Sequence, residues 1–155
     1  MSKTTEQPLL GRKALITGAS RGIGRAAAYA LAEQGADLFL LARTVGGLEE
    51  IHDEIKAAFP EREVVLIASD LTNFKEMEAL GPAIASKTDR LDIWVANAAM
   101  LSTMGPLAHG KFKEFQKVID TNLTTNFQLI RTLDPLLKNS DAARVIFVTS
   151  GAAQK

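Results

Sequence analysis

Three glycines lie where an apolar run meets an alanine-rich segment. Gly18, Gly22 and Gly24 occur in T-G-A-S-R-G-I-G, after Ala14–Ile16 and before residues 26–32, which have a helical pattern. A strand, a glycine turn and a helix in this order present the unpaired N–H groups and positive dipole of a helix N-terminus, which suit an anionic phosphate. Glycine permits the tight turn and a close approach of the phosphate. The segment therefore predicts a nucleotide site, with a tight turn that binds nothing as the alternative.

Two arginines indicate which nucleotide would bind. A site for NAD carries Asp or Glu about 20 residues beyond the glycine turn, where it bonds the ribose 2′-hydroxyl. This chain has Arg43 after its second apolar run, and Arg21 within the glycine turn. A guanidinium can bind a 2′-phosphate in bidentate fashion. The pair favours NADP(H), unless the arginines are solvated surface residues.

Polar residues also follow the later apolar runs. Asp70 follows the third run, Asn97 the fourth and Ser150 the fifth. Asp70 is also suited to cap a helix that begins near Asn73, and a Ser-Gly pair after a strand is typical of a turn. Asn122 is a polar residue within an apolar helical stripe, so its amide needs hydrogen-bond partners. On this ground it is either a site residue or a stabiliser of a helix kink.

Five short apolar runs are spaced as strands that must position these residues. None alternates with polar residues, so we expect each to be buried on both faces, as in a parallel sheet. Helical patterns lie between them, and strand-helix-strand units of this spacing predict a doubly wound α/β fold with its ligand crevice at the carboxyl ends of the strands. The predicted strands are Ala14–Ile16, Leu38–Leu41, Val64–Ala68, Ile93–Ala96 and Val145–Val148.

The helical segments carry their own boundary signals. Gly35 should close the first helix in a left-handed conformation, and Pro60 should stop the second. We expect the pair Gly81-Pro82 to bend or interrupt the third. The fourth helix is long, with an apolar stripe from residue 115 to 133.

The composition narrows the class of protein. The chain has 155 residues, 18 basic and 18 acidic side chains and no cysteine, which fits one domain, residues 11–155, after a flexible tail at 1–10. Balanced charge gives no case for nucleic acid or a membrane surface, and no apolar run is long enough to span a bilayer. His52 and His109 lack ligand partners at a metal-binding spacing. The absence of cysteine fits a reducing compartment, and we expect a cytoplasmic location.

These motifs together resemble the short-chain dehydrogenase/reductase family. The resemblance covers about Leu10 to Ser150 and includes T-G-x-x-x-G-x-G, Asn97-Ala98-Ala99 and Asn122-Leu-Thr-Thr. It implies a Rossmann-like sheet of order 3-2-1-4-5 with the later strands missing. It also implies hydride transfer between NADP(H) and a carbonyl or alcohol substrate. The implied cofactor-binding residues are Gly18, Ser20, Arg21, Gly22, Ile23, Gly24, Arg43, Asp70, Leu71, Asn97, Ala98 and Ala99.

The same resemblance assigns further roles. Asp70 would bond the adenine amino group with Leu71 beside the ring, and Ser150 would hydrogen-bond the reacting oxygen. Asn122 would help to hold the active-site lysine through water. Members commonly pair through the long helix that carries Asn122, so a homodimer or homotetramer is implied. Apolar residues of the 100–110 loop would either line a pocket or pack on the core: Met100, Leu101, Met104 and Leu107.

Two departures from the family pattern affect the functional prediction. Ala99 stands where the family has glycine, which adds a methyl group beside the cofactor. The family's Tyr-x-x-x-Lys is not present, because the only tyrosine is Tyr29 in the first helical segment. We therefore expect either the front portion of a larger oxidoreductase or a second chain that completes the sheet. A binding module or sensor for NADP(H) without catalysis is the alternative, and a signalling domain without nucleotide would leave Arg21 and Arg43 unexplained.

Overall fold

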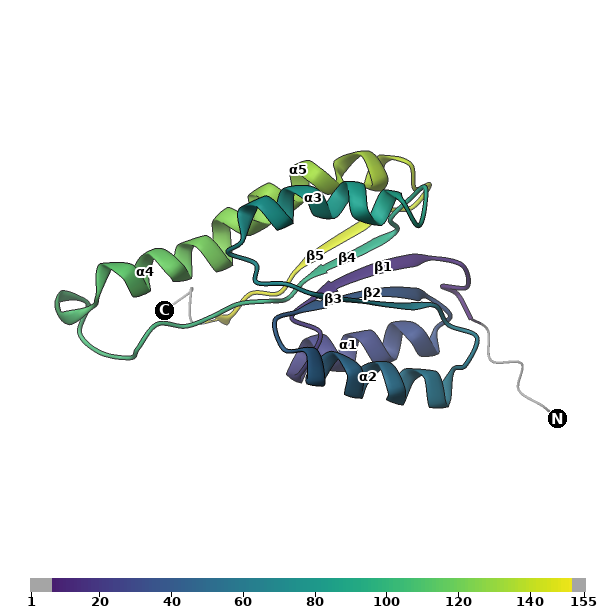
Figure 1. Ribbon diagram of the computed structural model, residues 1–155, viewed down its shortest axis with the longest axis horizontal. Helices are drawn as coiled ribbons and strands as arrows, with labels where there is room; N and C mark the ends of the chain where they lie inside the picture. The colour runs from purple at the N-terminus through teal and green to yellow at the C-terminus, as the bar shows by residue number, and fades with distance from the viewer. Residues whose placement is uncertain (1–6, 152–155) are drawn as a thin grey trace.

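The computed structural model describes residues 7–151 and contains one parallel sheet. Its strand order is β3-β2-β1-β4-β5, which confirms the doubly wound, Rossmann-like topology. Figure 1 shows the sheet between two layers of helices. The strands are β1 (Lys13–Thr17), β2 (Asp37–Ala42), β3 (Val64–Ala68), β4 (Ile93–Ala96) and β5 (Arg144–Phe147).

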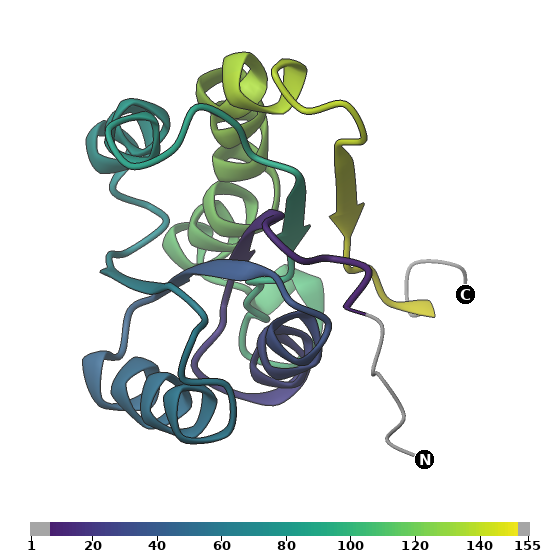
Figure 2. The same cartoon turned by 90° about the vertical axis from the view of Figure 1, so that its right-hand side faces the viewer.

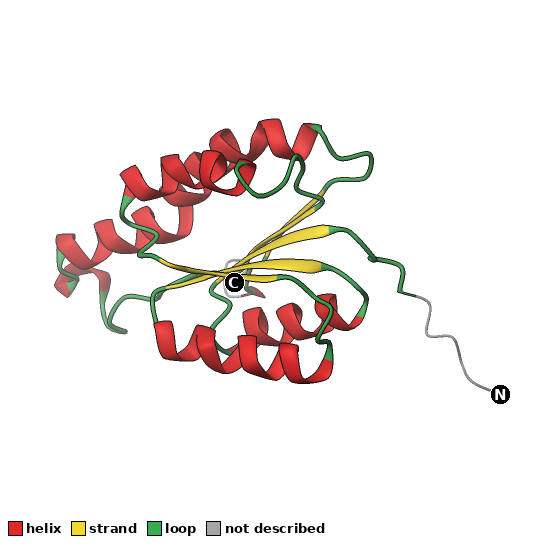
Figure 3. Cartoon of the chain, turned by 45° about the vertical axis from the view of Figure 1, so that its right-hand side comes forward, coloured by secondary structure: helices red, strands yellow, loops and turns green. Residues whose placement is uncertain are grey.

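The helices cover both faces of the sheet. Helices α1 (Gly22–Glu33) and α2 (Val45–Ala58) lie on one face, and α3 (Phe74–Ala85) and α5 (Thr125–Lys138) on the other, as Figures 2 and 3 show. Successive residues of a strand point to opposite faces. Leu15 accordingly packs in the core beneath α3 and α5, while its neighbours on β1 belong to the core beneath α1 and α2. The apolar run of β1 thus contributes to two cores at once.

The ends of α1 and α2 follow the predicted signals. Gly35 has φ of +102° and lies just past the C-terminus of α1. Helix α2 ends at Ala58 with Phe59 as its C-cap, immediately before Pro60. Both boundary predictions are confirmed.

Helix α3 is not interrupted at Gly81-Pro82, so of the two predicted outcomes, a bend or an interruption, the interruption was wrong. The helix runs from Phe74 to Ala85 with Pro82 inside it. Proline lacks the N–H that would bond the carbonyl four residues earlier, which is that of Glu78. The Thr132 hydroxyl on α5 donates to this carbonyl instead, at 2.8 Å. A partner 54 residues away thus satisfies the group that Pro82 leaves open.

The long fourth helix is divided into three parts. Helix α4 (Phe112–Ile119) leads into η2 (Asp120–Thr124), a π-helical turn, and then into α5. A short 3₁₀ turn, η1 (Leu107–His109), precedes α4. The apolar stripe alone predicts one regular helix, but the π turn inserts an extra residue at Asn122, and such turns are frequent at functional sites.

The fifth strand does not have the expected burial. Burial on both faces does not hold for the two edge strands of the sheet: β3 is only half-buried, and the side chains of β5 are exposed, Ile146 at 51%. Of the predicted tail at 1–10, the structure describes residues 7–10. Residues 7–10 form a turn, and the Leu9 N–H bonds the Gln34 carbonyl at 2.9 Å. In residues 7–151, no helix is long and apolar enough to span a membrane.

Candidate functional site

A cleft of about 790 Å³ opens at the carboxyl ends of four strands. Gly18 follows β1, Arg43 follows β2, Asp70 lies two residues beyond β3, and Asn97 follows β4. This is the edge at which ligands bind in doubly wound sheets. The predicted cofactor residues that line the cleft are Gly18, Ser20, Arg21, Gly22, Ile23, Arg43, Asp70, Leu71, Asn97, Ala98 and Ala99.

The three glycines of the turn meet different needs. Gly18 has φ of +69°, and a Cβ there would lie 2.9 Å from Asn97 Nδ2. A Cβ on buried Gly24 would lie 2.2 Å from the Gly18 carbonyl oxygen, so α1 can pack against the turn only with glycine at this position. Gly22 has φ of +55°, and a Cβ on it would have no neighbour within 4 Å, so its backbone faces open space.

The turn is anchored to β4 by two polar side chains. The Thr17 hydroxyl oxygen, on a residue only 1% exposed, accepts the N–H groups of Asn97 and Ala98 at 3.1 and 3.2 Å. Asn97 Nδ2 donates to the carbonyls of Thr17 and Gly18 at 3.1 and 3.3 Å. The sequence interpretation gave Thr17 no role of its own. A hydroxyl at the end of an apolar buried strand is the signal that could have identified it.

The N-terminus of α1 is bare and faces the cleft. No side chain caps it, and its first turn contains no acidic residue. The first N–H groups of a helix have no partner within the helix, so they and the dipole favour an anion. Arg21 and Arg43 are exposed and line the same cleft, and neither guanidinium makes a hydrogen bond or ion pair within the described residues. The electrostatics of this end of the cleft therefore suit a phosphorylated ligand.

Asp70 is held by its own loop. Its Oδ1 accepts the Thr72 N–H at 2.9 Å and the Thr72 hydroxyl at 2.8 Å. These hydrogen bonds lower the pKa of Asp70, and the nearby charge of Arg43 acts in the same direction. The cap of α3 is Asn73, whose side chain accepts the Glu76 N–H. The interpretation of Asp70 as the helix cap was therefore wrong, and its carboxylate stays ionised at the rim of the cleft.

Asn122 joins the π turn to the loop after β4. Its Oδ1 accepts the Met100 N–H and its Nδ2 donates to the Met100 carbonyl, both at 2.9 Å. Met100 and Thr121 line the cleft, and the Thr121 hydroxyl lies 3.4 Å from the Met100 sulfur. The two hydrogen bonds satisfy the half-buried amide and hold the loop in place. Leu101, Met104 and Leu107 are more than four-fifths exposed and do not line the cleft, so neither alternative holds for them; of the four loop residues, only Met100 lines the cleft.

Three residues of the predicted set are not among those that line the cleft: Gly24, Asn122 and Ser150. Gly24 is buried behind the turn, as its contact with Gly18 requires. Ser150 is exposed beyond the carboxyl end of β5 and is not among the lining residues. Pairing with β4 continues as far as Val148, whose N–H bonds the Ala96 carbonyl at 3.0 Å. Ser150 therefore lies near the same edge of the sheet as the cleft.

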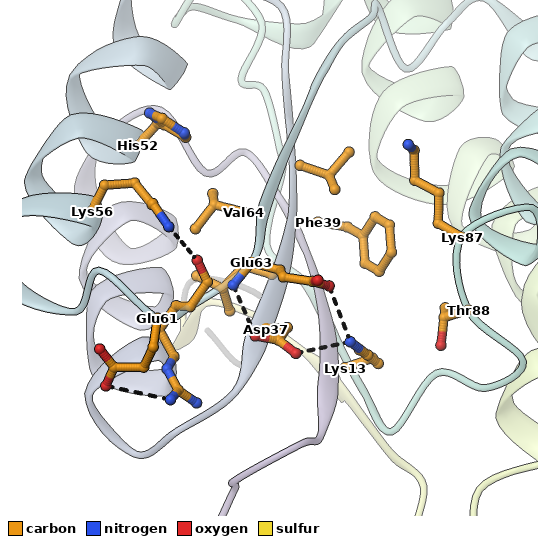
Figure 4. A pocket seen from close by; sticks show the side chains of 13 residues that line it. Lys13, Asp37, Phe39, His52, Lys56, Glu61, Glu63, Val64, Lys87 and Thr88 are labelled. Carbon is orange, nitrogen blue, oxygen red and sulfur yellow. Dashed lines mark hydrogen bonds and ion pairs between the residues drawn. The ribbon is translucent and has the colours of Figure 1, made fainter.

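A second hollow, of about 500 Å³, lies at the opposite end of the sheet. Figure 4 shows that Lys13, Asp37 and Glu63 point toward one another in this hollow. Lys13 Nζ bonds Asp37 at 2.8 Å and reaches Glu63 at 3.4 Å, and Asp37 also accepts the Glu63 N–H. These charges are largely neutralised locally and tie three strands together. Among the described residues, no group of three His, Cys, Asp or Glu side chains could hold a metal ion.

Comparison with known proteins places this geometry in one family. The family model described as short chain dehydrogenase matches residues 12–155. Because the chain has this fold and this cleft and matches the family model over most of its length, it belongs to the short-chain dehydrogenase family. Its members are oxidoreductases that use NAD(P), which agrees with the resemblance seen in the sequence.

Individual relatives show the extent of the similarity. The chain is 33% identical over 153 residues to the benzil reductase ((S)-benzoin forming) IRC24 of Saccharomyces cerevisiae, covering 94% of this chain and 57% of that protein. A short-chain dehydrogenase structure from Salmonella enterica serovar Typhi has a TM-score of 0.91 at 31% identity, with 99% of this chain and 64% of that chain covered. A structure from Escherichia coli CFT073 in complex with NADPH has a TM-score of 0.89 at 32% identity, with 96% and 63% covered. The chain thus spans less than two thirds of the length of these relatives.

Proposed function

We propose that this chain is the cofactor-binding part of an NADP(H)-dependent oxidoreductase that acts on a carbonyl or alcohol substrate. The observation that carries the proposal is the bare N-terminus of α1, which faces a cleft lined by the guanidinium groups of Arg21 and Arg43. The structure of the NADPH complex of a relative supports the same choice of cofactor. When bound, the nicotinamide group supplies or accepts a hydride.

The residues present fit such a cofactor. The backbone of Gly22 faces open space at the turn, so a phosphate meets no side chain there. Arg43 and Arg21 would bind the 2′-phosphate. Asp70 would accept a hydrogen bond from the adenine amino group, with Leu71 as an apolar wall. Asn97 to Ala99 would form the floor of the cleft, where Ala99 is exposed.

The substrate end of the site rests on two further residues. Ser150 would donate a hydrogen bond to the reacting oxygen as charge builds on it. Asn122 would keep the loop at Met100 in place through its two hydrogen bonds and support the proton relay of the complete enzyme. Both roles follow from the family resemblance.

A cofactor-binding module without catalysis is the second candidate. The family's proton donor is a tyrosine, and the only tyrosine of this chain is Tyr29 on α1, which packs edge-on against Phe59 at 5.3 Å between ring centroids. Tyr29 is therefore not in a position to act as a general acid in the cleft. Reduction of a carbonyl substrate with NADPH by the full encoded protein would favour the oxidoreductase, whereas NADPH binding by that protein without turnover would favour the module.

Titration of the chain with NADPH and NADH tests the cofactor. We expect tighter binding of NADPH, and we expect Arg43→Ala to weaken NADPH binding about tenfold while changing NADH binding by less than about twofold. Arg131→Ala is the matched control, because Arg131 is an exposed arginine of α5 outside the cleft lining. Equal affinities of the wild-type chain for the two cofactors would contradict the proposal.

We also propose a homodimer that forms through α4 and α5. Large apolar side chains are exposed along these helices, with Leu123 and Phe127 each 63% exposed. Burying such a stripe between two copies would remove it from water. Light scattering after size exclusion should give twice the chain mass, and Phe127→Asp should yield monomers. A wild-type monomer at micromolar concentration would refute this interface.

We further propose a cytoplasmic location, which rests on the cysteine-free sequence. Cell fractionation with an antibody against the chain tests it. Recovery in a secreted or membrane fraction would contradict it.

A further inference from the structure

Side-chain hydrogen bonds join helix α5 to residues 71–78, which include the end of the loop before α3 and the first turn of α3. Three α5 side chains, spaced at three and four residues, donate to main-chain carbonyls on this segment. Such spacing places them on one face of the helix. We name this set the α3–α5 seam. Its bonds are Thr125 to Leu71 at 2.6 Å, Gln128 to Phe74 at 2.9 Å and Thr132 to Glu78 at 2.8 Å.

The Thr132 bond, at the end of the seam that is far from the cleft, fixes the register of the two helices. The Thr132 hydroxyl occupies the carbonyl that Pro82 leaves without an N–H partner. At Gly81 a Cβ would lie 2.1 Å from the Thr132 carbonyl oxygen, so the two backbones are in direct contact. A sliding of α5 along α3 would break both arrangements. The helices therefore move as one unit.

The near end of the seam reaches the cleft. Thr125 is fully buried, and its hydroxyl oxygen lies 2.6 Å from the Leu71 carbonyl and 2.8 Å from the Asp120 carbonyl. A hydroxyl carries one hydrogen. The Asp120 carbonyl already accepts the Thr125 N–H in the π turn, so the hydroxyl hydrogen is best used on Leu71. Thr125 thus touches the adenine-side loop and the π turn that carries Asn122.

We propose that Thr125 is a positioning residue. It holds the loop of Asp70 and Leu71 in a fixed position relative to the π turn of Asn122. Occupation of the adenosine end of the cleft is then transmitted through Thr125 to the π turn that carries Asn122. The proposal rests on the proposed NADP(H) site. The physical basis is the buried Leu71 carbonyl: without the Thr125 hydroxyl it loses its hydrogen bond, and the loop must move to reach another donor.

Three substitutions separate positioning from general stability. Thr125→Val keeps the shape of the side chain but removes the hydroxyl, and Thr125→Ser keeps the hydroxyl. Thr132→Val breaks the far end of the seam without touching the cleft. The probe is adenosine 2′,5′-bisphosphate, which carries the adenosine and the 2′-phosphate but no nicotinamide. Calorimetry gives its affinity, and NMR follows the Asn122 side-chain amide.

The expected pattern distinguishes the variants. Thr125→Val should bind the probe about three- to tenfold more weakly, while Thr125→Ser and Thr132→Val stay within about twofold of wild type. The probe should shift the Asn122 amide signal in the wild-type chain and in Thr125→Ser but not in Thr125→Val. Thr132→Val should lower the melting temperature and leave that signal response intact.

Each contrary result has a defined meaning. Equal probe affinity and an equal Asn122 response in Thr125→Val and wild type would overturn the role of Thr125 alone. Failure of the wild-type chain to bind the probe would overturn the proposed cofactor site as well. Should Thr125→Val not fold, the wild-type response decides: binding of the probe without a shift of the Asn122 amide overturns the coupling.

Discussion

Replacing Thr17 by valine removes the polar link between β1 and β4 while keeping the side-chain shape. Thr17 is 1% exposed, and its oxygen accepts N–H groups from Asn97 and Ala98. The Asn97 N–H has a second acceptor, the Val95 carbonyl at 3.1 Å. The Ala98 N–H has no second acceptor among the described residues. The substitution therefore leaves one half-buried donor without a protein acceptor.

The expected loss of unfolding free energy in Thr17→Val follows from that single donor. An unsatisfied buried N–H costs about 1–3 kcal/mol, so we expect Thr17→Val to lower the free energy of unfolding by about 2 kcal/mol. For a domain of this size that corresponds to a fall in melting temperature of about 4–8 °C. The floor of the cleft contains Ala98 and Asn97, so NADPH binding should weaken as well.

Thermal unfolding and NADPH titration of Thr17→Val and Thr17→Ser check this reasoning. Serine keeps the hydroxyl and loses one buried methyl group, at about 1 kcal/mol. Thr17→Ser should therefore bind NADPH nearly as the wild type does, and Thr17→Val should not. The reasoning is refuted if the valine variant matches wild type in both measurements, or if serine is the more damaging of the two.

Two further outcomes follow from the packing and charge of the described residues. Gly24→Ala places a methyl group against the Gly18 carbonyl and should destabilise the turn severely, whereas Gly22→Ala meets no protein atom within 4 Å and should cost the fold only the positive φ, about 1–2 kcal/mol of stability, although its methyl group would obstruct the proposed phosphate position. Equal losses of unfolding free energy in the two variants would contradict this. Burial raises the pKa of Asp92, but hydrogen bonds from Ser140 and from other donors outweigh it and hold the pKa below its usual value. The stabilisation by this carboxylate is therefore complete above the unfolded value of about 4 and is lost as pH falls through the folded value. The difference in unfolding free energy between wild type and Asp92→Asn should shrink from pH 7 to pH 3, and a constant difference would be inconsistent with this linkage.

Local signals in the sequence predicted the sheet and the cleft because they depend on residues close in the chain. The apolar runs set the strands, and the polar residues after them reach the same edge because parallel strands share their direction. The positions of Arg43 and Asn97 follow from this alone. The roles that the site residues have in binding and catalysis stay predictions.

Features that depend on distant partners were not predictable in this way. Pro82 signals a break, but the Thr132 hydroxyl that compensates for it comes from another helix. The apolar stripe continues on both sides of Asn122, so the sequence pattern does not indicate the π turn there. The exposure of β5 depends on its place at the edge of the sheet. In each case the local structure or the burial depends on residues that are close in space but distant in the sequence.

The way the glycine turn is anchored explains how it can present donors to a ligand. A helix N-terminus is usually stabilised by a side-chain acceptor that uses its N–H groups, and α1 has none. Its anchor is instead Asn97, which donates to the carbonyls of Thr17 and Gly18 and so uses acceptors of the turn. The turn is fixed through these carbonyls and through the Gly18 and Ala19 N–H groups, which bond the Leu41 carbonyl, so the first N–H groups of α1 are left for an anion. Asn97→Asp would reverse this arrangement, because a carboxylate repels those carbonyls and adds negative charge beside the phosphate position. The variant should therefore lose NADPH affinity even where it still folds.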